Sequence, residues 1–150
     1  MMSYIGVIGA GVSSKEDDKL AYEVGKKIAE SDCVLICGGM GGIMKEASRG
    51  CREAGGTAIG ILPGHNYEDG NPYLTYAFTT GMGEMRNFLV VRFSDVLISI
   101  AGEYGTLSEM AIALKENKKV IALKPKYDIQ GLIKVNSPSE AVHYALSSLP

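Results

Sequence analysis

Short apolar runs alternate with amphipathic segments along the chain. Strands are predicted for the apolar runs at residues 4–8, 33–37, 57–62, 76–79, 95–100 and 119–123. Helices are predicted between and after these runs, at residues 15–30, 43–54, 82–93, 106–117 and 138–149. Most of the strands are continuous apolar runs, which is typical of parallel strands buried on both faces. The pattern therefore predicts an α/β fold with a three-layer, Rossmann-like, doubly wound parallel sheet.

Nothing in the chain interrupts this alternation. There is no internal repeat, no low-complexity segment and no change of composition that marks a domain boundary. Residues 1–150 are therefore expected to form a single Rossmann-like domain that binds a nucleotide or a phosphate. Near the end, Ser137, Pro138 and Glu140 form a capping-box pattern that predicts the start of the last helix.

The composition is that of an ordinary globular protein, with 46% hydrophobic and 21% charged residues. The formal net charge is −2, so no overall field attracts nucleic acid or an anionic membrane, and neither is an expected partner. Glycine is frequent, and many of the 19 glycines lie at the ends of predicted strands. A phosphate site is therefore expected to be local, built from main-chain N–H groups and one or two cations.

Cysteines and histidines give no sign of a disulfide framework or a metal site. Cys33, Cys37 and Cys51 contain no C-x-x-C pair, and we expect Cys33 and Cys37 to pack in the core. The two histidines, His65 and His143, do not form a ligand pattern. No basic leader is present, and no apolar run approaches the roughly 20 residues of a membrane span. These features predict a cytoplasmic protein without a bound metal.

Three turns that follow predicted strands are rich in glycine. They cover residues 9–14, 38–42 and 102–106. The carboxyl ends of parallel strands share one edge of a sheet, and the following helix N-termini offer unpaired N–H groups and partial positive charge. We therefore expect these turns to converge on a phosphorylated small molecule. The predicted ligand-binding residues are Gly9, Gly11, Ser13, Ser14, Gly38, Gly39, Gly41, Gly42, Gly102, Gly105 and Thr106.

Two common nucleotide motifs are incomplete or missing. The first turn resembles the G-x-G-x-x-G dinucleotide fingerprint, with Ser14 in place of the third glycine. The second predicted strand ends in Cys37-Gly38-Gly39, without the acidic residue that binds the ribose of NAD. The chain also lacks the G-x-x-x-x-G-K-[ST] motif of P-loop proteins. NAD binding and P-loop chemistry are therefore not expected.

Charged residues lie close to these turns. Thr106 and Glu109 have the spacing of a capping box at the start of a helix. In a second, compatible interpretation, Glu109 faces a bound sugar, where it can activate water or stabilise an oxocarbenium-like transition state. Arg86 begins an apolar helix at a position that normally favours an acid, which suggests a phosphate or carboxylate partner. The run 88–91 is apolar all round, which indicates a central helix or a subunit interface.

The order of these motifs resembles the Lonely Guy family, long mislabelled lysine decarboxylases. The resemblance covers about residues 4–124 and lies in Gly38-Gly39-x-Gly41-Gly42-Ile43-Met44, Gly55-Gly56, Gly60-Ile61-Leu62-Pro63, Met82-x-x-Met85-Arg86 and Gly102-x-x-Gly105-Thr106-x-x-Glu109. It implies a Rossmann-like homo-oligomer, usually a dimer, that hydrolyses the N-glycosidic bond of nucleoside 5′-monophosphates to base and ribose 5-phosphate. The resemblance also implies that Arg86 and Glu109 are the catalytic pair.

The chain departs from the hydrolases of this family in two motifs. Asn87 replaces the lysine that follows the arginine, and Ala101-Gly102-Glu103 replaces Pro-Gly-Gly. Glu103 brings a negative charge into a loop that is expected to face phosphate. These departures and the short chain are similar to a sister branch that includes molybdenum-cofactor carrier proteins, whose ligand is a phosphorylated pterin. No lysine stands out as a pyridoxal-phosphate anchor, so decarboxylation of lysine is not expected.

The predicted function is binding of a phosphorylated, nucleotide-like ligand, with hydrolysis of nucleoside 5′-monophosphates as the associated activity. The alternative is a non-catalytic carrier or sensor of a nucleotide or of a phosphorylated pterin such as the molybdenum cofactor. Arg86 and Glu109 favour the hydrolase, whereas Asn87 and Glu103 favour the carrier. Neither hypothesis requires a further cofactor beyond a bound nucleotide monophosphate or molybdopterin-type ligand.

Overall fold

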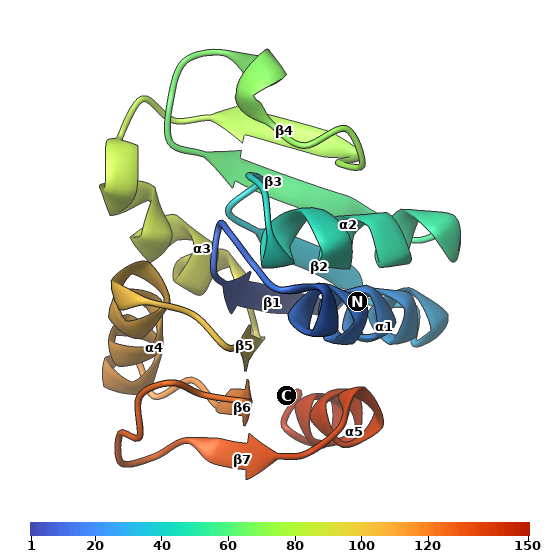
Figure 1. The fold of residues 1–150 in the computed structure, drawn as a ribbon, viewed down its shortest axis with the longest axis vertical. Coiled ribbons are helices and arrows are strands. Elements are labelled where there is room, and N and C mark those ends of the chain that lie inside the picture. Colours follow the sequence, from blue (N-terminus) through green and yellow to red (C-terminus); the bar gives the residue numbers. More distant parts are fainter.

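A seven-stranded sheet forms the centre of the computed structural model, which describes residues 1–150 (Figure 1). The strands are β1 (Tyr4–Gly9), β2 (Val34–Cys37), β3 (Ala58–Leu62), β4 (Tyr76–Thr79), β5 (Val96–Ile100), β6 (Val120–Leu123) and β7 (Ile133–Val135). Their order is β4-β3-β2-β1-β5-β6-β7, and every neighbouring pair is parallel. This sheet confirms the predicted α/β, Rossmann-like fold.

Helices cover both faces of the sheet. They are α1 (Lys15–Glu30), α2 (Ile43–Glu53), α3 (Asn87–Phe93), α4 (Tyr104–Lys115) and α5 (Pro138–Ser147), together with the short 3-10 helices η1 (Tyr67–Asp69) and η2 (Gly83–Arg86). Helices α1, α2 and α5 lie on one face, and α3 and α4 lie on the other (Figure 1). The three layers and the double winding are those that the sequence predicts. No helix combines the length and apolarity that crossing a bilayer requires.

The winding of the chain reverses at β1. From β1 the chain moves outward through α1 and α2 as far as β4, and α3 then returns it to β5 on the other side of β1. The loops after β1 and β5 therefore lead to helices on opposite faces of the sheet. Such a reversal opens a crevice beyond the carboxyl ends of the two strands, which is where open α/β sheets bind ligands.

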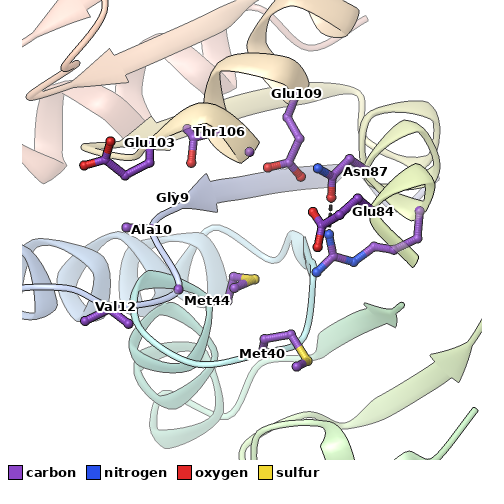
Figure 2. A pocket seen from close by; sticks show the side chains of 13 residues that line it. Gly9, Ala10, Val12, Met40, Met44, Glu84, Asn87, Glu103, Thr106 and Glu109 are labelled. Carbon is purple, nitrogen blue, oxygen red and sulfur yellow. Dashed lines mark hydrogen bonds between the residues drawn. The ribbon is translucent and has the colours of Figure 1, made fainter. Parts of the chain in front are cut away.

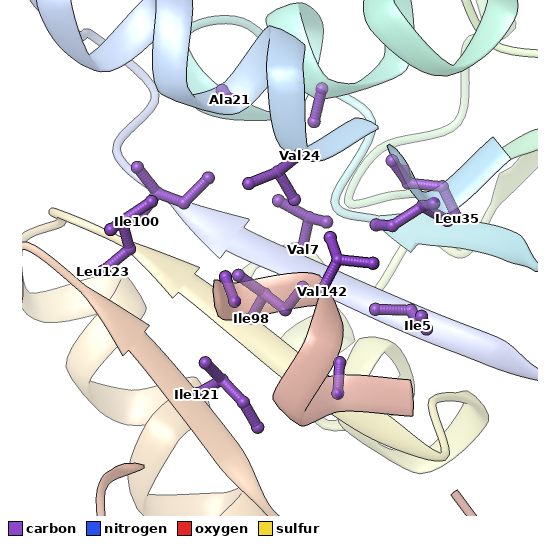
Figure 3. Close-up of a cluster of buried hydrophobic side chains, with 14 of the residues drawn as sticks. Ile5, Val7, Ala21, Val24, Leu35, Ile98, Ile100, Ile121, Leu123 and Val142 are labelled. Carbon is purple, nitrogen blue, oxygen red and sulfur yellow. The ribbon is translucent and has the colours of Figure 1, made fainter. Parts of the chain in front are cut away.

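Two apolar clusters hold the layers together. Beneath α1, α2 and α5, side chains such as Val7, Leu35 and Ile98 form the larger cluster (Figure 3). A second cluster lies beneath α3 and α4 and includes Val90 and Met110. Because the central strands contribute side chains to both clusters, their sequences are apolar at successive positions. All three cysteines are unbonded and buried in the larger cluster, which confirms the core position expected for two of them.

The start of α5 agrees with the sequence prediction, and the start of α4 differs from it. The Ser137 hydroxyl accepts a hydrogen bond from the Glu140 N–H at 3.1 Å, so the capping box of the last helix is confirmed. The capping-box interpretation of Thr106 is wrong, because α4 begins two residues earlier, at Tyr104, and has Glu103 at its N-cap. Thr106 therefore lies inside the first turn, where its hydroxyl is not in the capping position.

Two further segments differ from the prediction. Residues 82–93, predicted as one helix, form η2 and then α3, and Gly83 has the positive φ angle of 62° just where η2 begins. Strand β7 is not predicted, because three residues with Lys134 in the middle are too short for an apolar pattern.

Candidate functional site

A cavity of about 460 Å³ lies at the carboxyl edge of the sheet, in the crevice between β1 and β5 (Figure 2). Its walls come from the loops after β1, β2 and β5 and from the first residues of α2, η2, α3 and α4. The lining residues are Gly9, Ala10, Gly11, Val12, Met40, Met44, Glu84, Arg86, Asn87, Glu103, Gly105, Thr106 and Glu109. The cavity therefore occupies the position at which doubly wound sheets bind ligands.

The predicted residues divide into two groups by their place in these loops. Six of them line the cavity: Gly9, Gly11, Arg86, Gly105, Thr106 and Glu109. The other seven lie in the same loops outside the lining: Ser13, Ser14, Gly38, Gly39, Gly41, Gly42 and Gly102. The structure thus brings the three glycine-rich turns together at one cavity. Some of their residues form its wall, and the others lie elsewhere in the same loops.

The two serines are occupied at the start of α1. The Ser14 hydroxyl accepts a hydrogen bond from the Asp17 N–H at 3.1 Å, which is an N-cap. The Ser13 hydroxyl donates to the Asp18 carboxylate. These hydroxyls stabilise the first turn of α1 and are not directed at the cavity.

Two of the glycines allow the loops to approach one another closely. Gly42 has a φ angle of 61°, and a Cβ atom there would lie 2.3 Å from the carbonyl oxygen of Ala10. Gly102 has a φ angle of 108°, and a Cβ atom there would lie 2.4 Å from Thr106. A side chain at Gly42 would therefore push two loops apart, and one at Gly102 would displace Thr106 in the same turn. Glycine is needed at both positions for the shape of the cavity wall.

The helices that border the cavity begin without a capping side chain. Helix α1 is capped by Ser14, and α5 by Ser137, whereas α2 and α4 have no side-chain cap. The N–H groups of Met44 and Thr106, in the first turns of α2 and α4, have no hydrogen-bond partner. Two helix N-termini thus present free N–H groups and partial positive charge at the cavity, as anion sites do.

Arg86 is a buried cation without a counter-ion. Its side chain is 6% exposed and forms no ion pair. The Nε–H donates to the Ile61 carbonyl at 2.8 Å, Nη2 donates to the Gly38 carbonyl at 3.3 Å, and Nη1 donates to the Asn87 side-chain oxygen. All of these acceptors are neutral, and a buried charge is costly without a partner of opposite sign. The arrangement favours an anionic or strongly polar ligand.

Glu109 is buried in the same wall, and its carboxyl group points into the cavity (Figure 2). It is 7% exposed and has no hydrogen-bond partner among the side-chain contacts of the protein. Burial raises the pKa of Glu109 to about 8; the Arg86 guanidinium acts in the opposite direction, and the Glu84 carboxylate adds to the rise. Glu109 is therefore mostly protonated at neutral pH.

Asn87 connects Arg86 to the first turn of α4. Its Nδ2 donates to the Ser108 hydroxyl at 3.4 Å, and that hydroxyl donates to the Gly105 carbonyl at 2.8 Å. Asn87 is also buried and lines the cavity. The sequence marks Asn87 only as a departure from the family motif, because the contact with Ser108, 21 residues away, exists only in the folded chain.

Glu103 is neutralised by a lysine from the loop after β6. The Lys126 ammonium donates to the two Glu103 carboxylate oxygens at 2.7 and 2.6 Å. Beside this pair, the Tyr104 and Tyr127 rings stack with centroids 5.9 Å apart. The negative charge of Glu103 is therefore balanced by a nearby cation, although it remains at the rim of the cavity.

Sequence reasoning did not predict five other lining residues as ligand contacts: Ala10, Val12, Met40, Met44 and Glu84. Three of them, Ala10, Val12 and Met40, lie inside the glycine-rich turns. A signal for Met44 and Glu84 was their closeness in sequence to Gly42 and Arg86. Their side-chain directions, however, depend on how the loops pack.

The parallel sheet, the crevice at its winding reversal and the glycine-rich loops define a Rossmann-like α/β protein with a candidate ligand site at the carboxyl edge of its sheet. The model of the SLOG cluster4 family matches residues 2–148, so the chain belongs to that family.

Two relatives are similar to this chain in sequence, one over nearly its whole length and one over part of it. An uncharacterized protein of Archaeoglobus fulgidus is 46% identical over 144 residues, which are 96% of this chain and 95% of the relative. The cytokinin riboside 5′-monophosphate phosphoribohydrolase LOG of Oryza sativa subsp. japonica is 33% identical over 94 residues, which are 60% of this chain and 38% of that enzyme.

Two solved structures have nearly the same fold over nearly the whole chain. The molybdenum cofactor binding protein of Rippkaea orientalis has a TM-score of 0.92 and 36% identity, covering 98% of this chain and 97% of that one. The molybdenum cofactor carrier protein of Chlamydomonas reinhardtii has a TM-score of 0.91 and 30% identity, covering 99% and 98%. These similarities confirm the predicted resemblance to the Lonely Guy family and its carrier branch.

Proposed function

We propose that this protein carries a phosphorylated pterin, with the molybdenum cofactor as the candidate ligand, in the cavity between β1 and β5. One observation carries the proposal: the buried guanidinium of Arg86, held only by neutral oxygens, faces the same cavity as two uncapped helix N-termini. These groups place one cation and two partly positive helix ends at the cavity, in a chain whose net charge is −2. An anionic ligand supplies the counter-charge that Arg86 lacks.

Similarity to the molybdenum cofactor proteins supports the choice of ligand. Both structures cover almost the whole chain, whereas the plant hydrolase matches only 60% of it. A cavity of about 460 Å³ is within the usual range of small-molecule sites, roughly 300–1,000 Å³. The carrier hypothesis is therefore preferred over the hydrolase.

The test is retention of the cofactor by the protein. Purified protein is mixed anaerobically with molybdenum cofactor released from a molybdoenzyme and passed through a desalting column. Molybdenum content and the fluorescence of the oxidised pterin are then measured in the protein fraction. We expect both to co-elute with the wild-type protein and with Arg92→Ala, an exposed control, and to be lost from Arg86→Ala. Failure of the wild-type protein to retain the cofactor would refute the carrier hypothesis.

Hydrolysis of nucleoside 5′-monophosphates is the second candidate, because Arg86 and Glu109 share the cavity. A carboxyl group whose pKa is about 8 can donate a proton to a departing base near neutral pH. The test is incubation with AMP and other nucleotides while free base is measured by chromatography. We expect Arg86→Ala and Glu109→Ala to abolish any release. Release that persisted in both variants would contradict the assignment of this pair.

We further propose that the protein is a homo-oligomer and that an apolar groove of about 590 Å³ contributes to the interface. The groove lies over β2, β3 and β4 beside α3, and its walls include Ile59, Phe78, Leu89 and Phe93. Phe78 and Phe93 are 55% and 51% exposed, which is unusual for two phenylalanines that share one groove. A second copy of the chain would remove this apolar surface from water.

A further inference from the structure

We infer that the Arg86–Glu109 end of the cavity binds the ring of the ligand and selects 2-amino-4-oxopyrimidine rings, as in guanine and pterins. This inference rests on the proposed function, because it assigns two ends of the same cavity to two parts of one ligand. The class is defined by its hydrogen-bonding edge: an amino group, a ring N–H and a carbonyl oxygen in a row.

The lining of the cavity differs between its two ends. Toward one end lie Glu103 and Thr106, at the start of α4, and toward the other lie Glu109, Asn87 and Glu84 (Figure 2). At the first end the free donor is the main-chain N–H of Thr106 in the uncapped helix α4, which suits the oxygens of a phosphate. At the second end the polar groups are side chains, with Arg86 as donor and Glu109 as acceptor, which suit a planar polar ring.

Glu109 offers the cavity an acceptor that no group of the protein occupies. The residue is 7% exposed, lines the cavity and has no hydrogen bond within the chain. A carboxylate has two acceptor oxygens and binds two adjacent N–H donors in a bidentate pair. The ring N–H and the amino group of a 2-amino-4-oxopyrimidine are such adjacent donors. An adenine ring has no ring N–H beside its amino group, and hypoxanthine has no amino group.

Arg86 supplies the complementary donor. Three of its N–H groups bind Ile61, Gly38 and Asn87, which fixes the plane of the guanidinium. A guanidinium has five N–H donors, so two are left for a ligand. The carbonyl oxygen of the ring lies next to the ring N–H, on the side away from the amino group. The free N–H groups of Arg86, beside Glu109, thus match the carbonyl oxygen of the ring, which is the third group of its hydrogen-bonding edge.

Two methionines provide an apolar wall for the ring. Met40 and Met44 line the cavity, and a Cβ atom placed on Gly38 would lie 2.8 Å from both the Met44 sulfur and the Arg86 guanidinium. The Met44 thioether is therefore close to the cationic end of the cavity. Thioethers pack favourably against aromatic rings, so this wall suits the flat face of a heterocycle.

Binding of the ring is expected to release a proton from the Glu109 carboxyl group. The charged and titratable groups near Glu109 are Arg86 and Glu84 of η2 and Cys37 of β2. Since the pKa of Glu109 is about 8, the carboxyl group holds its proton in the free protein at neutral pH. Two N–H donors require the ionised form, so ring binding releases that proton, and affinity rises as the pH increases toward 8. A ligand bound through its phosphate alone keeps Glu109 protonated.

Calorimetric titration with GMP, IMP, AMP and inorganic phosphate tests the inference. IMP is the matched probe, because it lacks only the amino group of GMP. We expect GMP to bind about tenfold or more tightly than IMP and AMP. In Glu109→Gln the preference for GMP is expected to disappear, while affinity for inorganic phosphate stays within about twofold. Titration of wild-type protein in Hepes and in Tris, whose ionisation heats differ, is expected to show proton release with GMP.

The outcomes separate the two proposals. Equal affinity for the three nucleotides, or proton uptake with GMP, would overturn the ring assignment and leave an anion site in place. Absence of binding by phosphate and by all three nucleotides would overturn the proposed function, and the ring assignment with it. The wild-type measurements decide between these results even if Glu109→Gln fails to fold.

Discussion

The Arg86 guanidinium and the Glu109 carboxyl group face one cavity without forming an ion pair. Neutral oxygens hold Arg86, and burial keeps the pKa of Glu109 at about 8 despite the nearby cation. At neutral pH the charged side chains at this end of the cavity are therefore Arg86 and Glu84, while Glu109 is mostly protonated. An ion pair between Arg86 and Glu109 would instead occupy the hydrogen-bonding groups that a ligand needs.

Replacement of Arg86 by alanine removes the only cation among the lining residues. We expect Arg86→Ala to lower the affinity for nucleotides by about tenfold or more, because charge-assisted hydrogen bonds are lost. The measurement is the ligand-induced rise in melting temperature together with calorimetric titration. Arg92→Ala, which removes an exposed arginine paired with Glu116, is the control. Unchanged nucleotide binding in Arg86→Ala would show that the helix N-termini suffice.

Asn87→Asp places a carboxylate against the guanidinium of Arg86. The new ion pair cancels the positive charge, so we expect anion affinity to fall by about tenfold while the protein remains folded. Ser108→Ala is the control, because it breaks the same chain of hydrogen bonds without adding charge; its effect is expected to stay within about threefold. Calorimetry at low and high salt measures both. Equal losses in the two variants would indicate that position, not charge, is what Asn87 supplies.

Glu109 is expected to make stability depend on pH. Its pKa in the folded protein is about 8, above the value of 4.5 taken for an unperturbed glutamate, so the folded state binds the proton more tightly. The resulting stabilisation is present below pH 4.5 and is lost as the pH rises to about 8, by on the order of a few kcal/mol. Urea unfolding on both sides of this window measures it. In Glu109→Gln the dependence is expected to shrink, whereas exposed Glu68→Gln should behave like wild type.

The backbone at Gly42 is expected to tolerate no side chain. A Cβ atom would lie 2.3 Å from the Ala10 oxygen, and the φ angle of 61° adds strain. We expect Gly42→Ala to lower the free energy of unfolding by about 2–3 kcal/mol or more and to weaken ligand binding. Gly11→Ala is the matched control, since a Cβ atom there meets nothing within 4 Å. Chemical denaturation compares them, and equal stability of the two variants would argue against close packing of the loops.

Phe93→Glu is expected to convert the proposed oligomer to monomers, because it places a charge in the apolar groove beside Phe78. Light scattering coupled to gel filtration measures the mass of the wild-type protein and the variant. Tyr144→Glu, at a side chain of α5 that is 44% exposed, is the control and should leave the assembly unchanged. A wild-type protein of 16.0 kDa in solution would contradict the proposed oligomer.

Local sequence patterns predict the central sheet well and its margin poorly. Strands β2 and β5 are fully buried and apolar at every position except Ser99, so the pattern is clear. Strand β7 has three residues and an exposed lysine at its centre, which gives no periodicity to detect. The start of α4 was misplaced because Thr106 and Glu109 fit a capping box, although the turn after β5 already provides helical geometry from Tyr104.

For the candidate site, sequence predicts which loops meet and says little about how side chains pair. Glycine clusters mark the three turns because parallel strands end at one edge. The link from Asn87 to Ser108 and the ion pair of Glu103 with Lys126 join residues 21 and 23 positions apart. Such contacts depend on the packing of α3, α4 and the loop after β6. No local pattern contains that information.

Because the winding reverses at β1, the path of the backbone itself forms the cavity, without a bound ligand. Neighbouring loops diverge there by topology, so a molecule that enters meets walls already in place and little entropy is spent on ordering them. A few substitutions in the cavity wall are then enough to distinguish a carrier from a hydrolase, because the path of the backbone stays the same.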